Sequence, residues 1–140
     1  MLAALAALAL AGCSGGGLGD LPAFGKASDA WNVDPNRFPA DYRNELLSYL
    51  RVQLSDPTNV RAAYVTEPAL RTFGTESRYA VCVRYNARNS EGRYQGSQDN
   101  IAIYYGGRLN QLREATPEQC GAVAYQPFPE LEKLKRLDAR

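Results

Sequence analysis

The sequence predicts an α+β fold in which one N-terminal amphipathic helix packs on a small antiparallel sheet of three to four strands. Apolar residues recur at three- and four-residue spacing over residues 39–54 and at two-residue spacing from Val60 onward. Gly106-Gly107 then separates two more apolar segments, as the turn of a tight β-hairpin does. A sheet of this kind buries one face, and the helix is the element long enough to cover it.

The helix is expected at residues 39–54. Pro39 fits the first helical position because its missing N–H would have no partner there, and Asp41 suits the positive end of the helix dipole. Pro57 disfavours helical backbone at Asp56, so the helix should end before it. Its apolar face consists of Tyr42, Leu46, Tyr49, Leu50 and Leu54.

Strands are expected at 60–66, at 79–85, in a segment that opens between 94 and 98 and continues to 105, and at 108–112. The segment 79–85 alternates most regularly. Thr116-Pro117-Glu118 predicts a short helical turn that leads into Cys120, because Thr116 can cap it and Pro117 fits its first position. In the tail, 130–140, leucines at helical spacing and alternating charges are compatible with a helix.

The composition excludes several classes of function. Sixteen basic against fifteen acidic residues give a formal charge of +1, so the overall charge provides no electrostatic basis for binding nucleic acid or for a polybasic membrane sensor. Histidine is absent, so Ser-His and Cys-His nucleophile pairs and His-bearing zinc sites are excluded. No nucleotide-binding loop, nucleophile elbow or metal-ligand spacing occurs. We therefore expect no catalytic residue, no metal and no cofactor.

The first residues have the pattern of a processing signal. Residues 1–11 are Met, Leu and Ala only, a run too short to span a bilayer and typical of the apolar part of a signal peptide. The next motif, Leu10-Ala11-Gly12-Cys13, resembles the lipobox of bacterial lipoproteins. The resemblance implies cleavage after Gly12 and a lipid on Cys13 with an acylated, palmitate-type amino terminus.

The lipobox also implies a domain organisation and a location. Residues 1–12 would be the signal peptide, 13–36 a lipidated Cys with a Gly-rich flexible tether, 37–129 the globular domain and 130–140 the tail. In the enteric sorting system an Asp after the lipidated Cys retains a lipoprotein at the inner membrane, whereas Ser14 stands here. By that analogy the protein is attached to the outer membrane, in the cell envelope, and faces the periplasm.

If Cys13 carries lipid, Cys82 and Cys120 remain as an even pair in an oxidising compartment, and we expect a disulfide between them. The loop that it closes corresponds to about 4 kcal/mol of chain entropy. A redox-active cysteine is the alternative. It is disfavoured because the sequence has no Cys-x-x-Cys motif and no activating histidine.

The segment 86–96 reads Asn-Ala-Arg-Asn-Ser-Glu-Gly-Arg-Tyr-Gln-Gly. With Cys82 before it, and with Leu54-Ser55-Asp56-Pro57 and the run 125–129, it resembles a small alphaproteobacterial lipoprotein family without an established activity. The resemblance extends from Phe38 to Leu131 and implies no catalytic residue. A connection selected for turn geometry and a recognition loop both explain the segment.

Arginine and tyrosine indicate a binding surface, because thirteen of the sixteen basic residues are Arg and this pair is typical of interface hot spots. Both residue types also suit half-buried strand positions, which is the simpler interpretation. If the strands pair as predicted, the candidate binding residues cluster; they are Arg84, Arg88, Asn89, Arg93, Tyr94 and Arg108.

Three functions are compatible with these observations. The expected one is a lipid-anchored, non-catalytic binding or assembly module that docks an envelope protein or a cell-wall glycan. An alternative is a lipoprotein resembling lysozyme inhibitors, whose protruding loop at 88–93 would enter a foreign active site. A hydrolase that uses Asp41 and Glu45 is disfavoured, because paired catalytic acids need a cleft that one helix and a small sheet barely provide.

Overall fold

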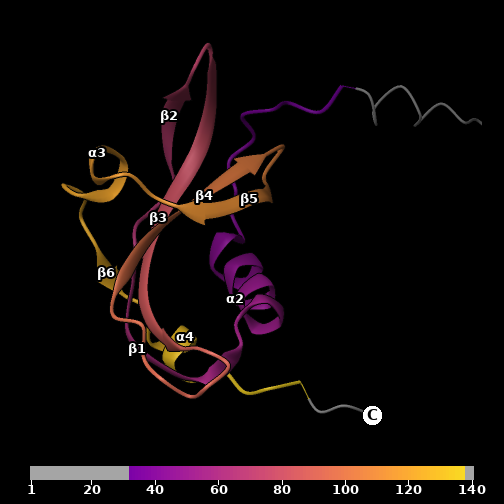
Figure 1. Ribbon diagram of the computed structural model, residues 1–140. Helices are drawn as coiled ribbons and strands as arrows, with labels where there is room; N and C mark the ends of the chain where they lie inside the picture. Colours follow the sequence, from indigo (N-terminus) through magenta and orange to yellow (C-terminus); the bar gives the residue numbers. More distant parts are fainter. Residues whose placement is uncertain (1–31, 138–140) are drawn as a thin grey trace, which may run out of the picture. The chain divides into compact units, whose positions relative to one another are not determined.

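The computed structural model describes residues 32–137, which form an antiparallel sheet with short helices on both sides (Figure 1). In this range the chain has six strands and three helices. In chain order they are α2 (Tyr42–Gln53), β1 (Asp56–Val65), β2 (Ala69–Phe73), β3 (Glu76–Arg88), β4 (Gln98–Tyr105), β5 (Arg108–Glu114), α3 (Pro117–Cys120), β6 (Gln126–Pro127) and α4 (Pro129–Glu132).

Strand β3 organises the sheet because its thirteen residues pair with three other strands. The order is β5-β4-β3-β1-β6, and β2 also pairs with β3. The first part of β3 pairs with β2 and its second part with β1, while β4 lies along the other edge. Every strand in the sheet therefore connects to β3 directly or through one neighbour.

The α+β prediction is confirmed, and the sheet is larger than expected, with six strands instead of three to four. The two additional strands carry weak local signals. Strand β2 lies mostly exposed and has no clear alternation, and Gly74, at φ +64°, turns the chain from it into β3. Strand β6 has two residues and forms because that segment meets the edge of β1.

Strand β1 contains an irregularity that changes which residues face the core. Ala62 adopts φ +49°, and the pairing with β3 shifts on both sides of Arg61. Because of this bulge, Val60 and Ala63 both lie in the core, although simple alternation would place them on opposite faces. The strand also begins at Asp56, before the predicted start at Val60.

The hairpin predicted at Gly106-Gly107 is confirmed between β4 and β5. Both glycines have positive φ, 58° and 80°, as a primed two-residue turn requires. The segment that precedes α2 contacts this turn, because the Gly106 N–H donates to the Pro35 carbonyl at 3.1 Å. Strand β4 begins at Gln98, and Tyr94 makes only an isolated bridge to Arg88.

One face of the sheet packs against α2 and α4 (Figure 1). Leu46 and Leu50 of α2 share this core with Val81 and Val83, odd-numbered residues of β3, and Phe128 and Leu131 complete it from the C-terminal side. Each of these residues has an exposed fraction of 1% or less. The predicted helix of 39–54 is thus present at Tyr42–Gln53 and covers the sheet as its apolar stripe requires.

The opposite face carries a second, smaller core. Ala80, Ile101 and Ile103 lie there with Cys82 and Cys120, which form the predicted disulfide with an S–S distance of 2.02 Å and a Cα–Cα distance of 5.8 Å. The Arg71 guanidinium also donates to the Gln119 carbonyl of α3. The sheet is therefore covered on both faces along part of its length, which the expectation of one buried face missed.

Near the C-terminus, α4 ends at Glu132, so only the first part of the tail has helical backbone. Leu131 and Leu134 are buried, and residues 138–140 lie outside the described range. The signal peptide, Cys13 and most of the predicted tether also lie outside it. Within residues 32–137, no helix is long and apolar enough to cross a membrane.

Candidate functional site

Next to the disulfide, the face of the sheet that carries the smaller core also presents arginine and tyrosine side chains. Register places Tyr64 and Asp99 beside Arg84, and Arg61 beside Asn86, so these residues share one face of β1, β3 and β4. Two further tyrosines contact them from connecting segments. We define the Arg/Tyr face by its six residues, which are Arg61, Tyr64, Arg84, Tyr94, Asp99 and Tyr125.

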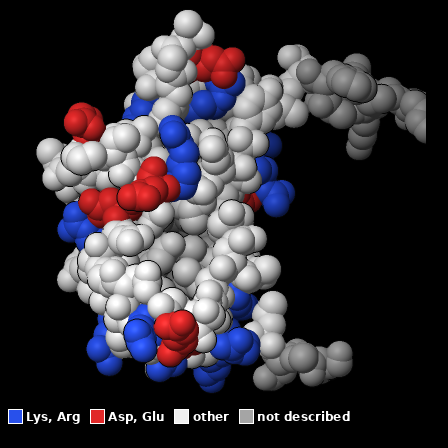
Figure 2. Space-filling model, in the orientation of Figure 1, with Lys and Arg blue, Asp and Glu red and all other residues white. Residues whose placement is uncertain are grey.

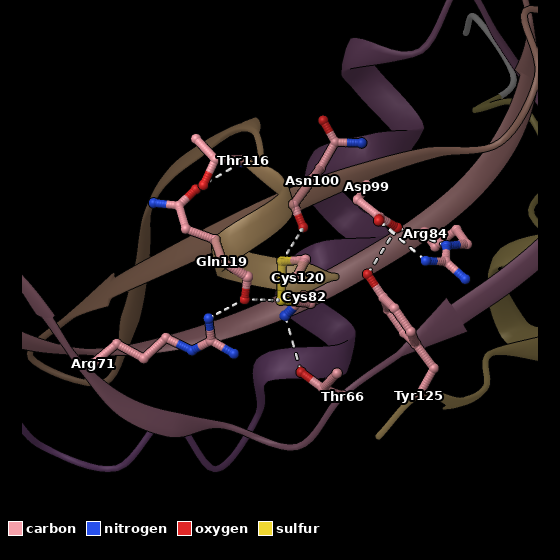
Figure 3. The surroundings of a disulfide bond; sticks show 10 residues. All are labelled: Thr66, Arg71, Cys82, Arg84, Asp99, Asn100, Thr116, Gln119, Cys120 and Tyr125. Atoms are coloured by element: carbon pink, nitrogen blue, oxygen red, sulfur yellow. Dashed lines mark hydrogen bonds and ion pairs between the residues drawn. A yellow bond between two sulfur atoms is a disulfide. The ribbon is translucent and has the colours of Figure 1, made fainter. Parts of the chain in front are cut away.

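Arg84, Asp99 and Tyr125 form a closed network next to the disulfide (Figure 3). Arg84 donates to both carboxylate oxygens of Asp99, at 2.6 and 3.1 Å. The Tyr125 hydroxyl donates to Asp99 at 2.9 Å, and its ring centroid lies 4.4 Å from the guanidinium carbon of Arg84. Each side chain thereby fixes the orientation of the other two.

The network also fixes the charges of its members. Hydrogen bonding from Arg84 lowers the pKa of Asp99 against the opposing effect of burial. Hydrogen bonding to Asp99 raises the pKa of Arg84. Burial, followed by the hydrogen bond to Asp99, raises the pKa of Tyr125. The carboxylate and guanidinium therefore stay charged and the phenol neutral near pH 7.

Arg61 and Tyr94 form a second stacked pair on this face. The guanidinium carbon of Arg61 lies 4.1 Å from the Tyr94 ring centroid, and the Tyr94 hydroxyl donates to the Asn59 carbonyl at 2.7 Å. Arg61 is exposed and makes no ion pair with any residue in 32–137. Its donors are consequently open to a partner, while the ring holds the guanidinium in place.

Arg88, which we expected to bind a partner, instead holds two strands together. Its Nε donates to Asp56 at 2.6 Å, joining the end of β3 to the start of β1. The other oxygen of Asp56 accepts the Thr58 hydroxyl at 2.6 Å and the Thr58 N–H at 3.0 Å. Hydrogen bonds from Thr58, opposed by burial and assisted by Arg88, hold the pKa of Asp56 well below its usual range.

The connection after β3 is shaped by its own polar side chains. The side-chain carbonyl of Asn89 accepts hydrogen bonds from the backbone N–H groups of Glu91 and Arg93, both at 3.0 Å. The Asn86 side chain accepts from the Gly96 N–H at 3.0 Å, and Gly92 and Gly96 have positive φ. Asn89 therefore has a turn-forming role, whereas the tip exposes Glu91 and Arg93.

Arg108 lies away from the other candidates, in the turn region of the β4-β5 hairpin. It pairs with Glu45 of α2, on the side of the sheet opposite the disulfide, so the six candidates do not form one cluster. Arg108, Asp41 and Glu45 line an open groove of about 640 Å³. Asp41 accepts from the Asn44 side chain at 2.6 Å, so both carboxylates of the hydrolase alternative have partners.

Sequence reasoning missed Arg61, Tyr64, Asp99 and Tyr125. Alternation along 60–66 could have placed Tyr64 on the polar face, but the bulge at Ala62 decides that Arg61 lies there too. Tyr125 reaches Arg84 because the segment after the disulfide returns across the sheet. Comparisons of the chain with protein-family models, curated proteins and solved structures give no match.

We expect the Asp56 carboxylate to contribute stability that depends on pH. Because its pKa is lowered in the folded state, this contribution is complete above the unfolded value of about 3.9 and is lost as the pH falls through the folded value. Asp56→Asn should lower the free energy of unfolding by about 1–3 kcal/mol at about pH 7, and by less at about pH 3. Urea denaturation at both pH values measures the difference.

Glu118→Gln serves as the matched control, since Glu118 is exposed and forms no ion pair within 32–137. It should change stability little at either pH. An Asp56→Asn effect of equal size at both pH values would contradict a role for the charged form.

Proposed function

We propose that this chain is a lipid-anchored protein of the cell envelope, attached to the outer membrane and facing the periplasm, and that it works as a non-catalytic binding module. The lipobox Leu10-Ala11-Gly12-Cys13 supports the anchor. The Cys82–Cys120 disulfide supports a compartment outside the cytosol, because disulfides form and persist in oxidising environments.

The Arg/Tyr face is the observation that carries the binding role. Its side chains are held by stacking and hydrogen bonds before a partner arrives, which reduces the conformational entropy lost on binding. Tyr64 keeps an exposed fraction of 38%, and the Arg84 side chain one of 37%. Open arginine donors beside tyrosine rings are typical of protein interface hot spots.

A protein with acidic residues at its surface is the partner that this face fits best. Arg61 provides free guanidinium donors that match carboxylates, and the rings of Tyr64 and Tyr94 add apolar contact area. A cell-wall glycan is the second candidate, because tyrosine rings also stack on sugars.

The electrostatics of two carboxyl groups, Asp56 and Asp99, do not suit general acid catalysis. Asp56 and Asp99 are both bonded to arginines, and the pKa of each is lowered. General acid catalysis near neutral pH needs a carboxyl whose pKa is raised instead. These two acids therefore suit a structural role that fixes the Arg/Tyr face and its supporting strands.

The anchor predicts a mass difference. Protein extracted from membranes should exceed the mass of the polypeptide that starts at Cys13 by the mass of its lipid, and Cys13→Ala should release the protein into the soluble fraction. Intact-mass spectrometry and fractionation check both. A wild-type protein that is soluble and unmodified would rule out the anchor.

The binding role predicts that Arg61→Glu weakens partner capture without unfolding the domain. With a photoreactive residue in place of Tyr64, Arg61→Glu should reduce the yield of a crosslinked partner about tenfold in cells, as expected for a hot-spot residue. The melting temperature should stay unchanged, because Arg61 is exposed and its side chain bridges no strands.

Arg37→Glu is the matched control, since Arg37 is also exposed and forms no ion pair within 32–137, and it lies beside Gly107 in the β4-β5 turn, at the opposite end of β4 from Asp99. It should leave the crosslink yield at the wild-type level. Equal yields from Arg61→Glu and the wild type would reject the Arg/Tyr face as the binding surface.

A further inference from the structure

A groove of about 570 Å³ lies between α2 and the segment that follows α4. Four cationic side chains line it, together with leucines. We call it the basic groove, and its lining residues are Leu47, Arg51, Glu130, Lys133, Leu134, Lys135, Arg136 and Leu137. It lies apart from the Arg/Tyr face, with which it shares no residue.

The positive charge of the basic groove is largely uncompensated by the described protein. Its one acidic lining residue, Glu130, contacts Arg43, which is not part of the lining, at 3.9 Å. Arg136 approaches Asp56 at 3.9 Å, but that oxygen already accepts two hydrogen bonds from Thr58. The groove therefore has four cations and one carboxylate, that of Glu130, which is oriented toward Arg43. Its net positive charge is complementary to an anion.

Arg51 provides an independent reason to expect a ligand. Its Nε is buried and has no hydrogen-bond partner among residues 32–137, so this part of the guanidinium lies in the wall of the groove at a free-energy cost. An anion bound to the other guanidinium nitrogens would offset this cost. An arginine needed only for solubility would gain more from turning its whole guanidinium into water.

The leucines limit the kind of anion. Leu134 is buried, whereas Leu137 has an exposed fraction of 60% although it follows Lys135 and Arg136 in the lining of the groove. Cations next to an exposed apolar side chain match an amphiphile, which joins a charged group to a hydrocarbon part. A fully hydrated small anion would leave Leu137 in water.

The surroundings extend the positive surface. Figure 2 shows Lys and Arg gathered at the end of the molecule where Figure 1 places α4 and the β3-β4 connection. The chain enters the domain at the β4-β5 turn, through the contact of Pro35 with Gly106. The nineteen residues of 13–31 can extend to about 60 Å, roughly twice the diameter of such a domain, so an anchored domain can bring this end to the bilayer.

We propose that the basic groove binds the phosphate of an anionic phospholipid headgroup, with Leu137 against the adjoining apolar part of the lipid. Arg51, Lys133, Lys135 and Arg136 would provide the charge. The proposal rests on the proposed lipid anchor only in that the anchor keeps the domain near a bilayer. Such a basic site beside an acyl anchor would act as a second membrane contact.

Vesicle sedimentation tests the proposal with the chain that starts at residue 13 and carries Cys13→Ser, which removes any contribution of an acyl chain and of the apolar residues 1–11. The protein should bind vesicles of phosphatidylcholine with phosphatidylglycerol and not vesicles of phosphatidylcholine alone. Lys133→Gln with Lys135→Gln should weaken binding about 25-fold, from about fivefold per cation near an anionic surface. Glu130→Gln should strengthen it, because the one carboxylate of the groove is removed.

Arg113→Gln is the control, since it removes one positive charge at an exposed position away from the groove. Unchanged melting temperatures would show that every variant folds, as the exposure of Lys133 and Lys135 leads us to expect. Equal losses from Arg113→Gln and from a single Lys135→Gln would overturn the site, because net charge alone would then explain binding.

Inorganic phosphate, added at the same phosphate concentration as the lipid, distinguishes the headgroup from the free anion. It should leave vesicle binding intact; complete displacement would contradict a lipid site. If the protein bound an acidic soluble protein but did not bind the vesicles, this result would also contradict a lipid site. None of these results bears on the lipid at Cys13, which the intact mass tests separately.

Discussion

The structure depends on the burial of β3 from both sides. Its odd-numbered residues, such as Val81 and Val83, pack against α2, and its even-numbered Cys82 is tied by a disulfide to α3 on the other face. A sheet of this size needs cover on only one face to form a core. The second cover is short, with four residues in α3, and the covalent bond holds it in place.

The same arrangement orders the Arg/Tyr face. The cover by α3 ends at the disulfide. The next residue of β3 on this face, Arg84, is therefore partly exposed, and the chain that returns from α3 places the Tyr125 ring against its guanidinium (Figure 3). Asp99 then fixes both by hydrogen bonds. A binding surface built in this way is rigid because its side chains are held by a core and by one another. The proposed binding role and the fold therefore share one cause.

Local signals were sufficient for part of this result. The amphipathic helix, the Gly106-Gly107 hairpin and the cysteine pair were predicted from period, turn chemistry and a count of thiols, and the structure confirms them. The composition of the Arg/Tyr face was not predictable, because it follows from tertiary events. A bulge at Ala62 turns Arg61 onto the face, and Arg88, which was expected to bind a partner, is instead held by Asp56 at the start of β1.

Amide hydrogen exchange of a Cys82→Ala, Cys120→Ala variant tests the central claim most directly. If the disulfide holds the second cover, protection should fall in the segment from α3 to Tyr125 and at Asp99, while the helix-facing core of α2, β1 and β5 keeps its protection. Unchanged protection from α3 to Tyr125 would contradict the claim, as would an equal loss throughout the domain.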